Sequence, residues 1–243
     1  VEFSVDGAGT TSADGKFTAP EENEHQVALL NCKVGDLTGM ARVRIVPPLP
    51  WEFDFAEGEV PLTWIGGRIR YVIDEKDGER FITKKNLLPT PKNPNNKLGT
   101  RSQMMMGPID LSDYTIQADF VLDELDDRLP DFGVINSTYT LAVRPMSKQL
   151  RVYSWSPHDH RTFAAVEFEP ESHKWYTMKL RVEPGKVDVK VLGKLWPRGE
   201  EEPKEWTVEM VDKSPNLQGS PGLFGKTETA ELSVDNIKVF ANE

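Results

Sequence analysis

The sequence predicts an all-β protein, and three observations support this. Short stretches of alternating apolar and polar residues recur along the chain, as expected for strands with one buried face. Glycine and proline, 18 of each, separate these stretches, which is typical of turns between strands. The apolar pattern of an amphipathic helix is missing over any useful length.

Residues 1–46 form the first predicted unit. Strands are expected at 1–5, 26–33 and 41–46, separated by turns at 6–9, 13–16 and 35–39. Short strands at this spacing indicate an immunoglobulin-like sandwich. The run Asp14-Gly15-Lys16-Phe17-Thr18-Ala19, followed by a valine-rich strand, resembles the second half of bacterial Ig-like domains. The unit is therefore expected to be a partial Ig-like domain whose first strands lie upstream of residue 1 or are absent.

The segment Pro47-Pro48-Leu49-Pro50 is the predicted boundary between two units. Proline fixes the backbone and lacks an N–H, so this stretch is expected to be a stiff linker that joins no sheet as a central strand. It separates the unit 1–46 from a second unit, 51–243.

The second unit is predicted to be a long series of strands. The final strand, within 230–240, has Leu232, Val234, Ile237 and Val239 as its apolar members, and the break in alternation at Asp235-Asn236 predicts a β-bulge. Residues 86–100 are expected to form a long loop, and Asp77-Gly78 a turn. The other expected strands are 51–55, 64–72, 80–84, 101–106, 115–122, 132–135, 139–144, 149–155, 162–168, 175–182, 186–194 and 205–210.

Three segments carry a family resemblance. The ending 219–240 resembles the closing strands of concanavalin A-like (laminin G-like) β-sandwiches, and 174–182 looks like another strand of that fold. The run Leu195-Trp196-Pro197-Arg198-Gly199, continued by Pro203 and Trp206, is similar to a hairpin of bacterial concanavalin A-like domains. The resemblance implies a partial Ig-like sandwich followed by a concanavalin A-like jelly-roll β-sandwich.

The order of the units resembles the C-terminal region of bacterial exported PQQ-type β-propeller (quinoprotein-like) proteins. That order is an Ig-like half, a proline linker and a lectin-type sandwich. This implies an exported location, which is periplasmic, cell-surface or extracellular. It also implies a protein partner. This partner is either the rest of a larger parent chain, with a β-propeller upstream of these residues, or a separate protein. The propeller is not part of this chain, so the resemblance brings no cofactor with it.

Charge and hydropathy exclude several classes of partner. The 29 Lys and Arg residues face 39 Asp and Glu residues, giving a net charge of −10, which argues against nucleic acid and anionic membranes. No apolar run reaches the ~18 residues of a membrane span, so membrane insertion is not expected. Cys32 is the single cysteine and is expected to be a buried small hydrophobe.

Catalytic residues are not predicted. Laminarinase-type β-glucanases place paired carboxylates on one strand in a Glu-x-Asp-x-x-Glu pattern, and the nearest match here begins at Glu124 but has Leu129 at the third carboxylate position. Keto-sugar hydrolases share the opening and ending of the resemblance, so an enzyme acting on a sugar derivative remains the alternative. His158 and His160 have metal-ligand character but are expected in a polar loop with no third ligand.

The candidate ligand-binding residues are Trp155, Tyr153, Arg151 and Arg144. The first three lie at i, i+2 spacing on one strand and therefore share a face, and Arg144 ends the preceding strand. Aromatic faces beside hydrogen-bonding groups are what a sugar site requires. The loop 86–100 would form its rim. The competing interpretation is that Tyr153 and Trp155 pack in the sandwich core.

Structural calcium is the one cofactor considered. Glucanase-type sandwiches hold Ca²⁺ through the Asp of the final strand and oxygens near the first strand, so the resemblance implies Asp235 and Asp54 as ligands, and their carboxylates suit this hard cation. The alternative is that both are ordinary turn or edge aspartates. Taken together, the sequence favours a non-catalytic β-sandwich module that binds carbohydrate or acts in protein interaction or scaffolding.

Overall fold

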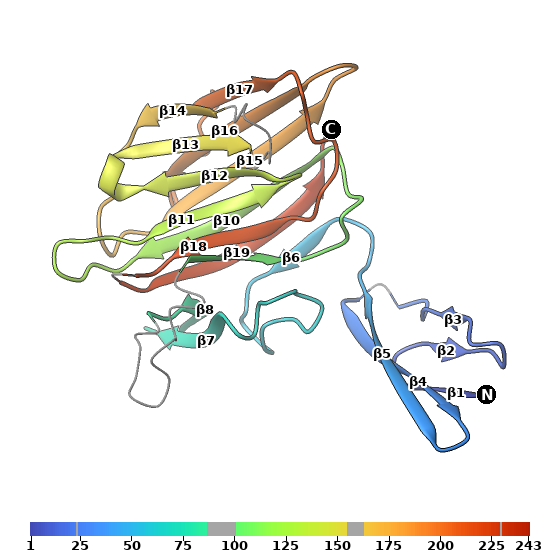
Figure 1. Cartoon of the computed structure of the whole chain (residues 1–243). Helices are drawn as coiled ribbons and strands as arrows, with labels where there is room; N and C mark the ends of the chain where they lie inside the picture. The colour runs from blue at the N-terminus through green and yellow to red at the C-terminus, as the bar shows by residue number, and fades with distance from the viewer. Residues whose placement is uncertain (23, 87–100, 155–162, 229) are drawn as a thin grey trace.

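The computed structural model describes residues 1–22, 24–86, 101–154, 163–228 and 230–243, and in these the chain is nearly all β (Figure 1). The described part contains one helical turn, the 3-10 turn η1 (Pro145–Ser147). The predicted all-β class and the sandwich architecture are confirmed. No helix among the described residues is long and apolar enough to cross a membrane.

Two large antiparallel sheets pack face to face to form the sandwich. The six-stranded sheet has the order β14-β13-β12-β11-β18-β9. Its strands are β9 (Arg101–Met105), β11 (Asp131–Asn136), β12 (Tyr139–Arg144), β13 (Gln149–Ser154), β14 (Phe163–Glu167) and β18 (Gly222–Lys226).

The eight-stranded sheet has the order β17-β16-β15-β10-β19-β8-β7, with β6 also paired to β19. Its strands are β6 (Trp51–Phe53), β7 (Tyr71–Lys76), β8 (Glu79–Lys84), β10 (Tyr114–Leu122), β15 (Tyr176–Pro184), β16 (Val189–Pro197), β17 (Val208–Asp212) and β19 (Leu232–Ala241). The C-terminal strand β19 therefore lies inside this sheet, between β10 and β8.

The core lies between the two sheets and follows from the period of two along each strand. Alternate residues of β13, Leu150 and Val152, are fully buried in it, as are Leu141 and Val143 of β12. The inward side chains of β19 are the four apolar residues that the sequence pattern identifies, Leu232, Val234, Ile237 and Val239. The intervening residues of each strand point to the outer faces, which carry the candidate sites.

The predicted bulge in the last strand is confirmed. Pairing of β10 with β19 shifts register between Gln117 and Asp119, and Asn236 has a left-handed φ of 47°. The extra residue lets Asp235 face outward while Ile237 returns to the core. The predicted Asp77-Gly78 turn is also confirmed, because both residues have positive φ and join β7 to β8.

The predicted strand at 64–72 is wrong for most of its length. Residues 61–70 form turns, and β7 begins only at Tyr71. Gly66 has a φ of 79°, and a Cβ on Gly67 would lie 3.0 Å from Trp64 and from Val60. The two glycines allow this segment to turn, so that Trp64 is buried and Ile65 forms an isolated β-bridge with Met105.

The N-terminal residues form a separate small unit beside the sandwich. A three-stranded sheet has the order β1-β4-β5, formed by β1 (Glu2–Gly7), β4 (Gln26–Val34) and β5 (Leu37–Ile45), with a two-stranded ribbon of β2 (Thr10–Thr11) and β3 (Phe17–Thr18). Ala28 is the one fully buried apolar residue among those described in 1–46, and Cys32 is half-buried rather than buried. The Ig-like assignment and the boundaries at 46 and 51 stay predictions.

The proline segment joins no sheet, as expected, and it is held by the first residue of the sandwich. The indole N–H of Trp51 donates to the carbonyls of Pro47 at 2.9 Å and Pro48 at 3.1 Å. His25, just before β4, lies edge-on to Trp51 at 5.1 Å and contacts Thr63 Oγ1 through Nδ1 at 3.0 Å. Aromatic and polar contacts therefore connect the N-terminal unit to the sandwich.

Candidate functional site

The outer face of the six-stranded sheet carries three rows of side chains that run across all six strands. Strand register defines each row, because residues directly opposite one another share a face. Along the order β14 to β9, the rows are Phe163, Tyr153, Thr140, Ile135, Gly222, Met105; Ala165, Arg151, Ala142, Gly133, Phe224, Gln103; and Glu167, Gln149, Arg144, Asp131, Lys226, Arg101. We call these the aromatic row, the middle row and the charged row. The face therefore grades from apolar to charged.

Arg151 is the central polar residue of this face. Its guanidinium carbon lies 4.0 Å from the ring centre of Phe163 and 5.8 Å from that of Tyr153. Its Nε is buried and has no hydrogen-bond partner within the described part of the chain. Burial, together with the nearby positive charge of Arg144, lowers the pKa of Arg151. The residue is held by rings rather than by carboxylates.

Phe163 is 57% exposed although it is a large apolar residue. It lies on the edge strand β14, beside the half-buried Tyr153. Tyr153 packs against a second apolar cluster, made of Ile135, Ala142 and Phe224, that is separate from the main core. Tyr153 therefore packs outside the main core, on the same face as Arg151, and ligand binding by this face stays a prediction.

Arg144 lies in the charged row at the end of β12. Its Nε lies 3.6 Å from Asp131 Oδ2, and the two side chains are 36% and 13% exposed. Burial raises the pKa of Asp131, against the opposite effect of Arg144, Lys226 and Arg101. The structure thus brings three of the four predicted ligand-binding residues, Tyr153, Arg151 and Arg144, to one face. Trp155 lies outside the described residues, as do most of the expected rim, 87–100, and the pair His158 and His160.

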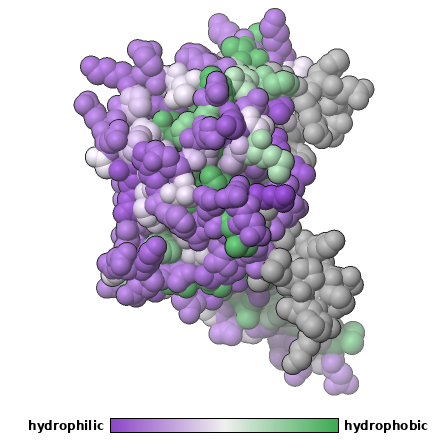
Figure 2. All heavy atoms as spheres, turned by 90° about the vertical axis from the view of Figure 1, so that its left-hand side faces the viewer, coloured by the Kyte–Doolittle hydropathy of each residue, from purple (hydrophilic) through white to green (hydrophobic). Residues whose placement is uncertain are grey.

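A cavity of about 510 Å³ adjoins the charged row. Asp131 and Lys226 line it together with Leu129, Pro145 and Met146. It lies where the β10–β11 loop and η1 meet, at the end of the sandwich that faces the viewer in Figure 2, where the surface is mostly hydrophilic with small separate apolar patches. A ligand on the charged row would have this cavity beside it.

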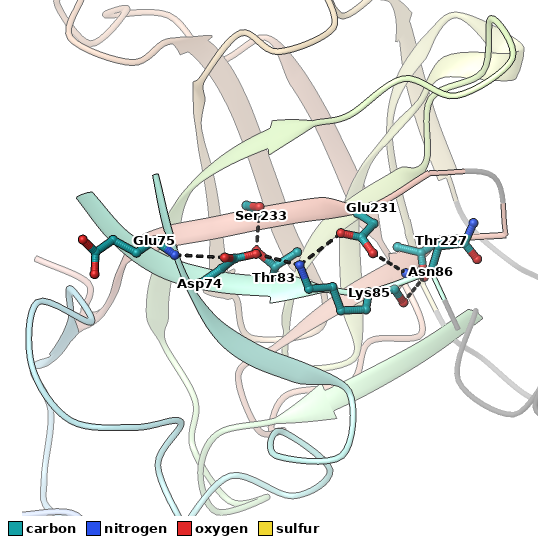
Figure 3. Close-up of polar contacts among 8 residues, drawn as sticks. All are labelled: Asp74, Glu75, Thr83, Lys85, Asn86, Thr227, Glu231 and Ser233. Atoms are coloured by element: carbon teal, nitrogen blue, oxygen red, sulfur yellow. Dashed lines mark hydrogen bonds and ion pairs between the residues drawn. The ribbon is translucent and has the colours of Figure 1, made fainter. Parts of the chain in front are cut away.

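The outer face of the eight-stranded sheet carries a second, acidic cavity, of about 420 Å³. Six carboxylates line it, from Asp74, Glu75, Asp77, Glu79, Asp123 and Glu231, beside Phe81 and Trp175. Lys85 crosses one side and contacts Asp74 Oδ2 at 2.6 Å and Glu231 Oε2 at 3.2 Å (Figure 3). Burial alone would lower the pKa of Lys85, but these two hydrogen-bonded carboxylates raise it.

Hydroxyl groups form the floor of this cavity. Thr83 Oγ1 and Ser233 Oγ are buried and lie 2.9 Å apart on the neighbouring strands β8 and β19. The hydrogen bond joins the two groups, so the floor is satisfied by the protein itself. Asp74 and Glu231 in the wall are therefore paired with Lys85, and the two hydroxyl groups with each other.

Arg198 covers a pair of buried carboxylates next to the acidic cavity. Its guanidinium carbon stacks over Trp175 at 4.6 Å, its Nη2 pairs with Glu79, and its Nε lies 3.7 Å from Asp119 Oδ2. Asp235 Oδ2 lies 4.0 Å from Arg198 Nη1. Burial raises the pKa of Asp235 to about 6, since this carboxyl is only 3% exposed.

The two predicted calcium ligands have different surroundings. Asp235 is buried and faces Asp119, Glu79 and Arg198, whereas Asp54 is exposed and accepts a hydrogen bond from the N–H of Ala56 at 3.2 Å. Within the described ranges, no group of three or more His, Cys, Asp or Glu residues is arranged to hold a metal ion. Calcium binding stays a prediction.

The segment that begins at Glu124 is a loop. Leu125 and Arg128 bridge each other across Asp126 and Asp127, which both have left-handed φ values. A tight turn of this kind does not place carboxylates along one face of a strand, so this segment does not match the β-glucanase pattern.

Comparisons with known proteins gave distant similarities to solved structures alone. A scan against protein-family models and a search of the curated proteins gave no match. Among solved structures, the carbohydrate-binding module CBM66 from Bacillus subtilis is 12% identical, with a TM-score of 0.49 over 74% of this chain and 96% of that one. The Caenorhabditis elegans galectin LEC-6 is 9% identical, with a TM-score of 0.38 over 65% and 94%. A bifunctional GH43-CE protein of Bacteroides eggerthii is 14% identical, with a TM-score of 0.48 over 98% of this chain and 35% of that one.

Sequence reasoning missed Phe163 and the Asp119–Asp235 pair. Phe163 could have been found from the period of two in the expected strand 162–168, where it alternates with the core residues Ala164 and Val166. Asp119 and Asp235 are far apart in the sequence, and only the pairing of β10 with β19 brings them together.

Proposed function

We propose that this chain is a non-catalytic carbohydrate-binding module of an exported protein, and that its ligand lies on the outer face of the six-stranded sheet. The single observation that carries the proposal is the arrangement of Arg151 between Phe163 and Tyr153. Sugars present apolar ring faces and many hydroxyl groups, so they bind where an aromatic surface adjoins groups that hydrogen-bond.

Three features support this assignment. Phe163 is a large apolar side chain on an edge strand and is 57% exposed. The centre of the middle row is made of the small residues Ala142 and Gly133, which do not stand above the larger side chains on either side. Arg144 and Asp131 add donors and acceptors at the far end of the face.

The test is binding of the purified chain to a panel of polysaccharides, read by affinity electrophoresis and calorimetry. Phe163→Ala and Tyr153→Ala are each expected to weaken binding by about tenfold or more, on the order of 1.4 kcal/mol, and Trp155→Ala joins the set. The matched control is Phe240→Ala, since Phe240 is a half-buried phenylalanine with a lysine 5.9 Å above it on the other sheet.

Binding that survives the two face variants and falls in the control would overturn the assignment. If no glycan binds, the chain is a scaffold or protein-interaction module, and the upstream part of its parent chain becomes the partner to identify. An exported location and a β-propeller parent belong to this proposal and rest on the sequence resemblance alone.

A hydrolase acting on a sugar derivative is the second candidate, and one observation favours it. Asp119 and Asp235 are cross-strand partners on one face, and burial raises the pKa of Asp235 to about 6 while Asp119 accepts two hydrogen bonds. Two carboxyls held in different environments are the usual basis of acid–base division in glycoside hydrolysis. Release of reducing sugar that is abolished in both Asp119→Asn and Asp235→Asn would support it, and activity that is unchanged in both would exclude this pair.

A further inference from the structure

The outer face of the six-stranded sheet reverses the charge of the protein as a whole. The chain carries a net charge of −10. In the described strands, however, the three rows hold four cationic residues and two acidic ones. The cations are Arg101, Arg144, Arg151 and Lys226, and the carboxylates are Asp131 and Glu167. Local charge of this sign attracts anionic ligands and repels cationic ones.

Within the described part, the protein neutralises the two arginines nearest the rings, Arg144 and Arg151, only weakly. Asp131 faces Arg144, and their contact is long, at 3.6 Å, whereas Lys226 has its own carboxylate, Glu228, at 3.2 Å. No carboxylate of the described part pairs with Arg151, whose Nε has no hydrogen-bond partner there. Arg144 and Arg151 are close enough for their charges to disfavour each other.

Two arginines that are crowded together beside aromatic rings match one kind of ligand. An arginine guanidinium presents a planar fork of donors that fits a carboxylate or sulfate group. The neighbouring rings, Tyr153 and Phe163, offer a stacking surface for the sugar that carries this group. The aromatic and charged rows are separated by four residues along each strand, roughly 13 Å, so one chain of several sugars can contact both.

We propose that this face binds anionic glycans, whose carboxylate or sulfate groups lie against Arg144 and Arg151 while their rings lie against Tyr153 and Phe163. This rests on the proposed carbohydrate-binding function and names its ligand class. The cavity beside the charged row is lined by four carboxylates, those of Asp127, Asp131, Glu169 and Glu228, against Arg128 and Lys226, so it is not part of the proposed anion site.

The experiment compares matched polymers that differ in charge. Polygalacturonate is compared with its carboxyl-reduced form, and dextran sulfate with dextran, on the full chain at low and at high salt. Binding to at least one of the anionic polymers is expected to be about tenfold or more tighter than to its neutral counterpart, and to weaken as salt is added. The two pairs separate carboxylate from sulfate as the source of the charge.

Variants locate the effect on the face. Arg144→Gln and Arg151→Gln are expected to weaken binding to the anionic polymer by a larger factor than binding to the neutral one, and so to reduce the preference. Arg151→Lys retains the positive charge and is expected to retain part of the preference. The control is Arg42→Gln, which removes the same charge from the exposed surface of β5. Thermal melts confirm that each variant is folded.

The outcomes separate the two proposals. Equal affinity for the anionic and neutral polymers would overturn the anionic preference and leave carbohydrate binding in place. Failure to bind any polymer would remove both. A single-stranded oligonucleotide that binds as tightly as polygalacturonate would show that the face recognises charge without sugar, and this also would overturn the inference.

Discussion

Asp119 on β10 and Asp235 on β19 lie directly opposite each other on one face of the eight-stranded sheet, yet only Asp119 accepts hydrogen bonds from other side chains at both carboxylate oxygens. Asp119 accepts hydrogen bonds from Thr177 Oγ1 at 2.7 Å and from Asn236 Nδ2 at 2.9 Å. Asp235 Oδ1 is buried with no partner in the described part. Asp119 therefore has a structural role, whereas burial disfavours the charged form of Asp235.

Asp235→Asn is expected to raise the melting temperature above pH 6. Burial raises the pKa of Asp235 from 3.8 to about 6. As the pH falls, the folded state therefore binds this proton at a higher pH than the unfolded chain does. The stabilisation from that proton is complete below pH 3.8 and is lost as the pH rises through 6. A neutral side chain would recover up to about 3 kcal/mol. Asp119→Asn is the contrast and is expected to lower the melting temperature; a gain of stability in that variant would contradict this account.

His25→Gln is expected to make the protein less sensitive to acid. Burial lowers the pKa of His25 from 6.5 to about 4, where its ring packs against Trp51 and Phe53. As the pH falls from 6.5 towards 4, the unfolded chain binds a proton that the folded chain does not, and stability is lost. Urea melts between pH 7 and 4 measure this. An acid-induced loss of stability in His25→Gln as steep as in the wild-type protein would contradict this prediction.

Gly133→Ala is expected to destabilise the sandwich by about 1–3 kcal/mol, the usual cost of overpacking. A Cβ at Gly133 would lie 2.4 Å from the carbonyl oxygen of Leu141 and 2.9 Å from the Cβ of Ala142. Gly39→Ala is a suitable control, because no atom lies within 4 Å of the Cβ position there. Thermal melts of both variants check the prediction, and an unchanged melting temperature for Gly133→Ala would show that β11 and β12 can separate without cost.

Calcium is expected to raise the melting temperature relative to EDTA, and Asp235→Ala is expected to remove that increase. The prediction follows from the sequence resemblance, which assigns Asp235 and Asp54 to a calcium site. The matched variant is Asp54→Ala. If the melting temperature is the same with calcium and with EDTA, the calcium hypothesis is wrong.

Local patterns predicted most of the fold. Strand β12 lies at the predicted residues, and the bulge at Asp235-Asn236 was visible as one break in alternation. The error at 64–72 has a local cause, because a run that begins with Trp64 and Ile65 looks like a strand unless Gly66 and Gly67 are taken as the centre of a turn. A glycine pair is compatible with both structures, and packing against Val60 selects one of them.

The proposed binding face was predicted in part, and that part also depended on a local pattern. The i, i+2 spacing was enough to place Arg151 and Tyr153 together, since successive side chains of any strand alternate in direction. That the shared face is an outer face, and that Phe163 and Arg144 join it, depends on which strands lie beside β13. The pattern along one strand does not predict which strands lie beside it.

The sequence by itself determined the class of fold and the positions of most strands, because alternation and turn chemistry act between residues close in the chain. Only the tertiary structure decided that Arg144 lies near Asp131, that Asp119 faces Asp235, and that positive charge gathers on one face of an acidic protein. Strand pairing brings distant residues together, and charge, burial and pKa depend on that proximity.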